Sequence, residues 1–136
     1  MKELKLKASD DTLYTVLDEL KAALMQNGCP DDILNSILIA AEEIYVNIAH
    51  YAYGGKPGKA LVGIDVGTDT KLCRLIFKDK GTPYNPLDKP DPDITLSAEE
   101  RGIGGLGIYM VKEIMDKVEY EYKDGQNILI MEKKFA

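Results

Sequence analysis

The spacing of hydrophobic and polar residues predicts strands and helices along most of the chain. Residues Glu3 to Lys7 alternate polar and apolar side chains, which is typical of a strand with one exposed face. Apolar residues then recur at helical spacing in two stretches, which predict helices from about Leu13 to just before Gly28 and from Pro30 to about Tyr51. Gly28 is expected to end the first helix, because glycine readily adopts the left-handed conformation found beyond many helix ends.

The second half of the chain shows the same two periods on either side of an irregular segment. The predicted elements are strands 60–66 and 72–78, a helix 106–117, and a hairpin of strands 118–122 and 128–133. Asp124-Gly125 is a favoured turn for that hairpin. Neither period persists from Gly81 to Gly105, a stretch that holds several prolines. So long a segment in a small domain is typically a functional lid or a disordered insert, and both interpretations stay open.

The order of these elements predicts an α/β two-layer sandwich of the α+β class. Antiparallel hairpins with all helices on one side give a mixed, mostly antiparallel sheet that three helices cover on one face. The irregular segment before the last helix, about residues 82–105, is the candidate lid. The sequence shows no internal repeat and no linker between domains, so we expect one domain spanning residues 1–136.

Composition and charge narrow the classes of protein that this domain fits. With 45% hydrophobic and 29% charged residues, the 136-residue chain resembles an ordinary globular domain, and no apolar run reaches the roughly 20 residues of a membrane span. The net charge of −6 disfavours binding to nucleic acid. Two cysteines cannot make a disulfide framework, and a single histidine excludes a multi-histidine metal site. We therefore expect a cytoplasmic enzyme or binding module without nucleic-acid or membrane partners.

Three motifs contain residues that helix or strand formation does not require, and the first lies in the second helix. Glu43 and Asn47 are four residues apart and therefore lie on one helix face. Apolar residues flank that face, so both polar groups point toward the apolar layer or its rim, where unpaired polar atoms are costly. One interpretation is a polar pair at the solvent edge. The other is a carboxylate base beside an amide oxygen that can bind a hard cation such as Mg²⁺.

The second motif, Asp79-Lys80-Gly81, follows a predicted strand. Aspartate and glycine are common in turns for purely local reasons, and a simple turn is therefore one interpretation. In the other, the carboxylate accepts a hydrogen bond from an exocyclic amine such as that of adenine. The glycine then lets a flat ring approach the backbone.

The third motif spans Arg101 to Gly107 (RGIGGLG), where the irregular segment ends and the third helix begins. Glycines are entropically costly, so this stretch requires backbone shapes that side chains forbid. Its exposed amides and the positive end of a helix suit an anion such as a triphosphate, whereas the alternative is a flexible hinge. No strand leads directly into these glycines, which disfavours a dinucleotide-binding fold.

In their order and spacing, the three motifs resemble those of the GHKL (Bergerat-fold) ATPase superfamily, whose members include gyrase, Hsp90 and histidine kinases. The matching motifs are Glu43-x-x-x-Asn47 on a helix, Asp79-x-Gly81 after a strand, and Gly105-Leu106-Gly107 opening a helix after the lid. The resemblance covers nearly the whole chain. Within the superfamily it indicates the small bacterial anti-sigma factor serine/threonine kinases.

The resemblance implies a role for each motif residue. Glu43 stands at the position of the family's catalytic carboxylate and would accept the proton of the attacking hydroxyl. Asn47 would hold the Mg²⁺ that bridges the ATP phosphates. Asp79 would bind the adenine amine, and Gly81 would lie beside the base. The stretch Gly104-Gly105-Leu106-Gly107 would wrap the phosphates.

Three further positions depart from the family's pattern and are expected to contact the nucleotide. Tyr51 stands where several members have a histidine. Arg101 is the candidate for an arginine that often precedes the glycines. Asn127 belongs to a segment that replaces a glycine–threonine pair, and it is the polar substitute for that pair.

The resemblance also implies an overall function, namely an ATP-dependent serine/threonine kinase that acts as an anti-sigma factor. Its substrate would be a serine of a small anti-sigma factor antagonist, and a sigma factor would be its second partner. A homodimer that uses ATP and Mg²⁺ is expected. Two alternatives stay open: a non-catalytic ATP-binding switch that sequesters a protein partner, and a slow ATPase in a phosphatase-linked signalling system.

Overall fold

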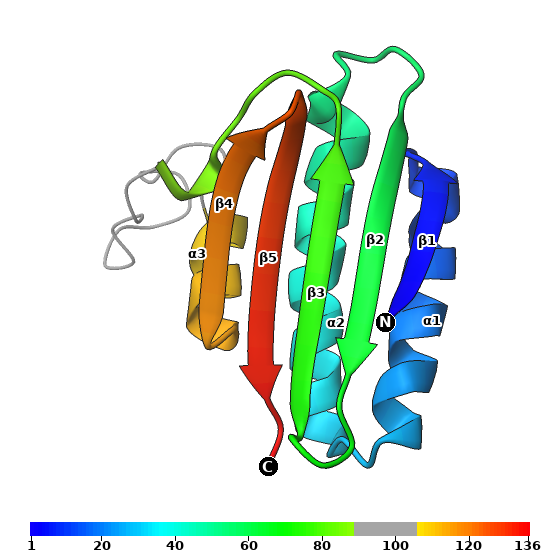
Figure 1. The fold of residues 1–136 in the computed structure, drawn as a ribbon, viewed down its shortest axis with the longest axis vertical. Helices are drawn as coiled ribbons and strands as arrows, with labels where there is room; N and C mark the ends of the chain where they lie inside the picture. Colours follow the sequence, from blue (N-terminus) through cyan, green and yellow to red (C-terminus); the bar gives the residue numbers. More distant parts are fainter. Residues whose placement is uncertain (89–105) are drawn as a thin grey trace.

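The computed structural model describes residues 1–88 and 106–136, and it contains a five-stranded sheet backed by helices (Figure 1). The strands are β1 (Lys2–Lys7), β2 (Lys59–Val66), β3 (Leu72–Asp79), β4 (Lys117–Lys123) and β5 (Gln126–Lys134). They lie side by side in the order β1-β2-β3-β5-β4, and every neighbouring pair is antiparallel.

Three helices cover one face of this sheet, namely α1 (Leu13–Gln26), α2 (Asp31–Asn47) and α3 (Leu106–Ile114) (Figure 1). Their apolar sides and the inward side chains of the strands form one core, in which Val16, Ile37 and Leu75 are almost completely buried. The predicted two-layer α/β sandwich with three helices on one face is confirmed.

The sheet is more regular than the mixed arrangement we expected, because the five described strands include no parallel pair. The connections explain this regularity. Two helices lie between β1 and β2, so the chain reverses three times before β2 pairs with β1. The helix α3 and strand β4 likewise give three reversals between β3 and β5. An odd number of reversals leaves neighbouring strands antiparallel.

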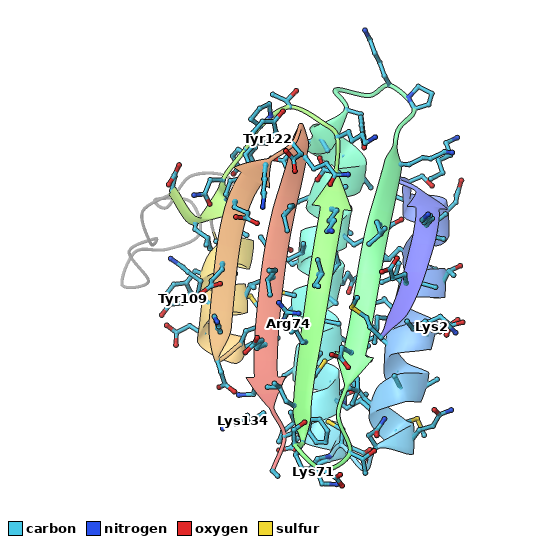
Figure 2. All side chains as sticks on the ribbon, in the orientation of Figure 1. Lys2, Lys71, Arg74, Tyr109, Tyr122 and Lys134 are labelled. Atoms are coloured by element: carbon cyan, nitrogen blue, oxygen red, sulfur yellow. The ribbon has the colours of Figure 1, made fainter. Side chains whose placement is uncertain are left out.

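Side chains alternate between the two faces of the sheet, as the period of two predicts. Burial along β3 alternates residue by residue, with Cys73, Leu75 and Phe77 on the helix-covered side. Arg74 lies on the uncovered face (Figure 2), where its Nε is 3.3 Å from Glu132 Oε2 of the neighbouring β5. One face is thus a core and the other is exposed.

Glycines end the first helix and close the last hairpin as predicted. Gly28 has a φ of +77°, its N–H bonds to the Met25 carbonyl, and the next N–H bonds to that of Leu24. This pair of bonds satisfies carbonyls that the helix end leaves unpaired. Asp124 and Gly125 have φ values of 54° and 76°, the combination that a tight two-residue hairpin turn requires.

Two predicted helix ends differ from the structure. The third helix was expected to reach Lys117, but it ends at Ile114 and Lys117 begins β4. Asp116 N–H bonds to the Glu132 carbonyl at 2.9 Å, and its carboxylate accepts a bond of 2.7 Å from Lys134 N–H. These long-range bonds to β5 replace the next helical turn.

None of the helices in the described residues is long and apolar enough to cross a membrane.

The second helix changes its hydrogen bonding before its predicted end at Tyr51. The α-helix ends at Asn47, and a π-helical turn, η2 (Ile48–Ala52), continues it. A π-helical turn widens the helix by one residue and is frequent at functional sites. This turn faces the end of β3.

Candidate functional site

The C-terminal part of α2 carries the first predicted pair of functional residues. Glu43 and Asn47 are half-buried on one helix face, and Asn47 Nδ2 donates a hydrogen bond of 3.4 Å to Glu43 Oε1. Ala40 and Ile44 hold this part of the helix against the core. The Asn47 amide oxygen has no hydrogen-bond partner among the described residues. The pair therefore lies at the rim of the core with oxygen atoms that a ligand can use.

Gly107, in the first turn of α3, lies directly against the Glu43 carboxylate. A methyl group on Gly107 would be 1.9 Å from Glu43 Oε1 and 2.2 Å from its Cδ, far inside contact distance. With the Glu43 side chain in this position, only a residue without a side chain fits at position 107. The carboxylate also lies beside a helix N-terminus, whose partial positive charge favours an anion. Glu43, Asn47 and Gly107 form the Glu43 cluster.

The second motif lies at the end of β3, against the π-helical turn. A methyl group on Gly81 would be 2.1 Å from the Ala52 carbonyl oxygen, which also accepts a 2.8 Å bond from Thr82 N–H. Asp79 is only 6% exposed, and its Oδ1 accepts a bond of 2.9 Å from Gly81 N–H. Its Oδ2 has no hydrogen-bond partner within the described part of the chain. The carboxylate is thus held through one oxygen only.

Asn127, at the start of β5, lies opposite Asp79 in the strand register. Its Nδ2 donates hydrogen bonds to Asp79 Oδ1 at 2.9 Å and to the Thr82 carbonyl at 3.0 Å. Its Oδ1 accepts bonds from Tyr84 N–H at 3.1 Å and from the Tyr120 hydroxyl. Asn127 is 7% exposed. These contacts join residues that are 48 positions apart in the chain into one buried polar group.

Two tyrosines without a predicted role hold this region together. The Tyr53 hydroxyl accepts a bond of 2.9 Å from Lys80 N–H, which ties the end of β3 to the segment after α2. Tyr120 donates to Asn127, and burial raises the pKa of its hydroxyl. The strand register places Tyr122 opposite Asn127, yet the hydroxyl that bonds to the Asn127 amide is that of Tyr120, two residues earlier in β4, so neither spacing nor register identifies this contact. Asp79, Gly81, Asn127 and Tyr120 form the Asp79 cluster.

Tyr51 lies apart from both clusters. It is in the π-helical turn, is 70% exposed, and contacts the ring of His50 edge-on with ring centroids 6.0 Å apart. No hydrogen bond in the described part of the chain joins it to Asp79 or Glu43. In this conformation its phenol is a surface group.

The remaining predicted nucleotide contacts belong to the third motif. Leu106 begins α3. Arg101, Gly104 and Gly105 lie outside the described residues, as does most of the candidate lid at 82–105. The described part of this motif is therefore the first turn of α3.

The Glu43 cluster includes the last turns of α2, and the π-helical turn that continues α2 packs against the Asp79 cluster through the contact of Ala52 with Gly81. One cluster offers a carboxylate, an amide oxygen and a helix N-terminus. The other offers a buried carboxylate with one oxygen engaged, beside a glycine. Together they suit a ligand that has a phosphate end and a flat base with an amine.

Comparisons with known proteins agree with this chemistry. The sequence matches the histidine kinase-like ATPase domain model over residues 6–133. It is similar to serine-protein kinase RsbW of Bacillus velezensis, with 23% identity over 131 residues that cover 93% of this chain and 81% of that protein. Serine-protein kinase RsbW of Staphylococcus aureus is 24% identical over 135 residues, which cover 93% and 82% of the two chains.

The fold is also similar to that of solved structures. The RsbU and RsbW domains of Rv1364c from Mycobacterium tuberculosis match with a TM-score of 0.62 at 14% identity, over 98% of this chain and 32% of that one. The Erythrobacter litoralis EL346 blue-light activated histidine kinase matches with a TM-score of 0.59 at 13% identity, over 90% and 42%. At these identities the likeness concerns the fold alone, and this chain spans less than half of either larger one.

Proposed function

The chain belongs to the histidine kinase-like ATPase domain family, and we propose that it is an ATP-dependent protein serine kinase that acts as an anti-sigma factor. The family supports ATP binding, and the similarity to RsbW serine-protein kinases supports kinase activity. In this proposal the acceptor is a serine of an anti-sigma factor antagonist, and a sigma factor is the second partner. Residues 1–136 act as one domain within a homodimer.

The position of the Glu43 carboxylate is the observation that carries the proposal. A general base must lie within hydrogen-bond reach of the proton that it removes, and close to the group that is transferred. Glu43 lies at the rim of the core and against Gly107 at the start of α3. We propose that the glycine stretch ending at Gly107 wraps the ATP phosphates, with Arg101 and Tyr51 as further contacts and the lid at about 82–105 above them.

The proposed reaction is transfer of the γ-phosphoryl group of ATP to the serine hydroxyl. Glu43 accepts the hydroxyl proton while the serine oxygen forms a bond to the γ-phosphorus. The bond between that phosphorus and the β–γ bridging oxygen breaks, and ADP leaves. Positioning and electrostatic stabilisation supply most of the rate enhancement in transfers of this kind.

Asn47 is the residue that we propose for Mg²⁺. Its amide nitrogen donates to Glu43, and its carbonyl oxygen has no partner among the described residues, so an oxygen ligand of the kind that hard cations prefer is present. When bound, Mg²⁺ neutralises charge on the ATP phosphates. Asn47 would also keep the Glu43 carboxylate oriented through the bond between the two side chains.

Asp79 is the residue that we propose for recognition of adenine. Its Oδ1 is engaged by Gly81 N–H and by Asn127 Nδ2, and its Oδ2 remains for the adenine amine. A carboxylate oxygen is a strong acceptor for such a donor. Gly81 lacks a side chain that would keep a flat ring away from the backbone.

Phosphate transfer from labelled ATP tests this function. The protein is incubated with [γ-³²P]ATP, Mg²⁺ and candidate antagonist proteins, and label is sought on the partner and as free phosphate. We expect label on a partner serine. Glu43→Gln should keep ATP affinity and lower transfer by about 10²–10⁴-fold, the usual contribution of a general base. Asn47→Ala should lower both affinity and transfer.

The same assay separates the alternatives. Free phosphate without a labelled partner indicates a slow ATPase. Tight ATP binding with neither product indicates a non-catalytic switch. Transfer at the parental rate by Glu43→Gln would mean that another group is the base.

A further inference from the structure

The side-chain amide of Asn127 uses its full hydrogen-bonding capacity on the protein itself. An amide has two N–H donors and one oxygen with two acceptor sites. The donors bond to Asp79 Oδ1 and to the Thr82 carbonyl, and the oxygen accepts from Tyr84 N–H and from the Tyr120 hydroxyl. A nucleotide contact would require Asn127 to give up one of these bonds at a buried position, which is costly. Direct binding of the nucleotide is therefore not the role that this geometry indicates.

The bond from Asn127 to Asp79 determines which carboxylate oxygen remains for a ligand. Asn127 Nδ2 and Gly81 N–H both donate to Oδ1, each at 2.9 Å. Two donors on one oxygen hold the carboxylate in a single orientation. Rotation of the carboxylate would break both bonds inside a site where Asp79 is 6% exposed. Oδ2 is thereby directed away from Asn127.

The other bonds of Asn127 hold the first residues after β3. Thr82 and Tyr84 are attached through their carbonyl and N–H groups to the same amide that holds Asp79. Tyr120 on β4 fastens the amide from the opposite side. One side chain thus connects the carboxylate at the end of β3 with the backbone that leads away from it.

We propose that Asn127 is a positioning residue that sets the choice of nucleobase. This role of Asn127 rests on the function proposed above, because it assumes that Asp79 Oδ2 accepts the adenine amine. Asn127 acts through Asp79 and does not touch the nucleotide. Asn127 also holds the backbone of Thr82 and Tyr84 at the edge of the base site. The Asp79 carboxylate and this backbone segment then have fixed positions around the base.

The test compares ATP with inosine triphosphate, which carries a carbonyl instead of the amine at the same ring carbon. A carboxylate oxygen attracts the amine and repels the carbonyl, so we expect the parent protein to prefer ATP by about 10–100-fold, the value of one charge-assisted hydrogen bond. Asn127→Ala should reduce this preference to within about threefold of unity, mainly through weaker ATP binding. Affinities are measured by calorimetry.

The ratio of the two affinities is informative even when a variant is less stable. Partial unfolding lowers the apparent affinities for both nucleotides by the same factor and leaves their ratio unchanged. Tyr45→Phe is the matched control, because it removes a buried side-chain hydrogen bond, that between the Tyr45 hydroxyl and Thr12 Oγ1, outside both clusters. It should keep the parental ratio. In an Asp79→Asn background, Asn127→Ala should change the ratio no further.

The outcomes distinguish this proposal from the proposed function. If Asp79→Asn abolishes the preference for ATP and Asn127→Ala keeps it, the base site stands and the role of Asn127 is overturned. If Tyr45→Phe abolishes it as completely as Asn127→Ala, general destabilisation explains the effect and the proposal is also overturned. If Asp79→Asn itself keeps the parental ratio, the assignment of the base site is wrong.

Discussion

Two glycines in the candidate site allow a matched test, because alanine at each would meet a different kind of atom. A methyl group on Gly81 would lie 2.1 Å from the Ala52 carbonyl oxygen and 2.5 Å from its carbon, and both belong to the backbone. A methyl group on Gly107 would lie 1.9 Å from Glu43 Oε1, at the end of a flexible side chain. The two clashes are similar in distance, but only one involves atoms that are free to move.

Gly81→Ala should destabilise the fold. The methyl group fits only if the end of β3 separates from the π-helical turn, which breaks the 2.8 Å bond from Thr82 N–H to the Ala52 carbonyl. Overpacking costs about 1–3 kcal/mol and the lost bond adds about 0.5–1.5 kcal/mol. We expect the free energy of unfolding to fall by about 1.5–4.5 kcal/mol in total.

Gly107→Ala should leave stability almost unchanged and impair phosphate transfer. The Glu43 carboxylate can rotate away from the methyl group, and alanine favours a helix over glycine by about 0.5–1 kcal/mol. The free energy of unfolding should therefore stay within about 1 kcal/mol of the parent value. Displacement of the proposed base should lower transfer by about 10²–10⁴-fold.

Urea denaturation followed by circular dichroism gives the stabilities, and transfer from labelled ATP gives the activity. The double variant Gly107→Ala/Glu43→Gln is the control, because it should be no less active than Glu43→Gln alone if both changes act through one carboxylate. Equal destabilisation by the two glycine substitutions would refute the packing argument. Parental transfer by a folded Gly107→Ala protein would refute the importance of the contact with Glu43.

Three further predictions concern groups outside the site. Cys73 is fully buried and burial raises its pKa to about 12, so we expect iodoacetamide to leave it unmodified in the native protein at about pH 8, and rapid labelling detected by mass spectrometry would contradict this. The bond from Lys134 N–H lowers the pKa of Asp116, so its stabilisation is present above the unfolded pKa of about 4 and is lost as pH falls through the folded value. Asp116→Asn should therefore lose less stability than the parent between about pH 6 and pH 3 in urea titrations, and equal losses would exclude the linkage. Tyr45→Phe removes a buried hydroxyl that is 2.6 Å from Thr12 Oγ1 and should cost about 0.5–1.5 kcal/mol by the same measurement, whereas a gain in stability would show that this bond is unfavourable.

The sequence by itself determined the elements of this fold and the composition of its first motif. Periods of two and 3.6 are local properties, and they predict α1, β3 and the hairpin around Asp124 with nearly the observed bounds. Glu43 and Asn47 lie on one face of α2 for the same reason, since a spacing of four residues is nearly one helical turn. The π-helical turn and the early end of α3 were not predictable, because each depends on bonds to distant segments.

Only the tertiary structure decided which residues meet. Nothing local to Asn127 indicates that its amide is bonded to Asp79, because that contact depends on the register between β3 and β5. A shift of one residue would turn Asn127 to the uncovered face of the sheet, and the packing of the whole core excludes that shift. The contact between Gly107 and Glu43 likewise depends on how closely α3 approaches α2. Periodicity is decided within a few residues of chain, whereas register and helix approach are decided by side chains that pack together from its whole length.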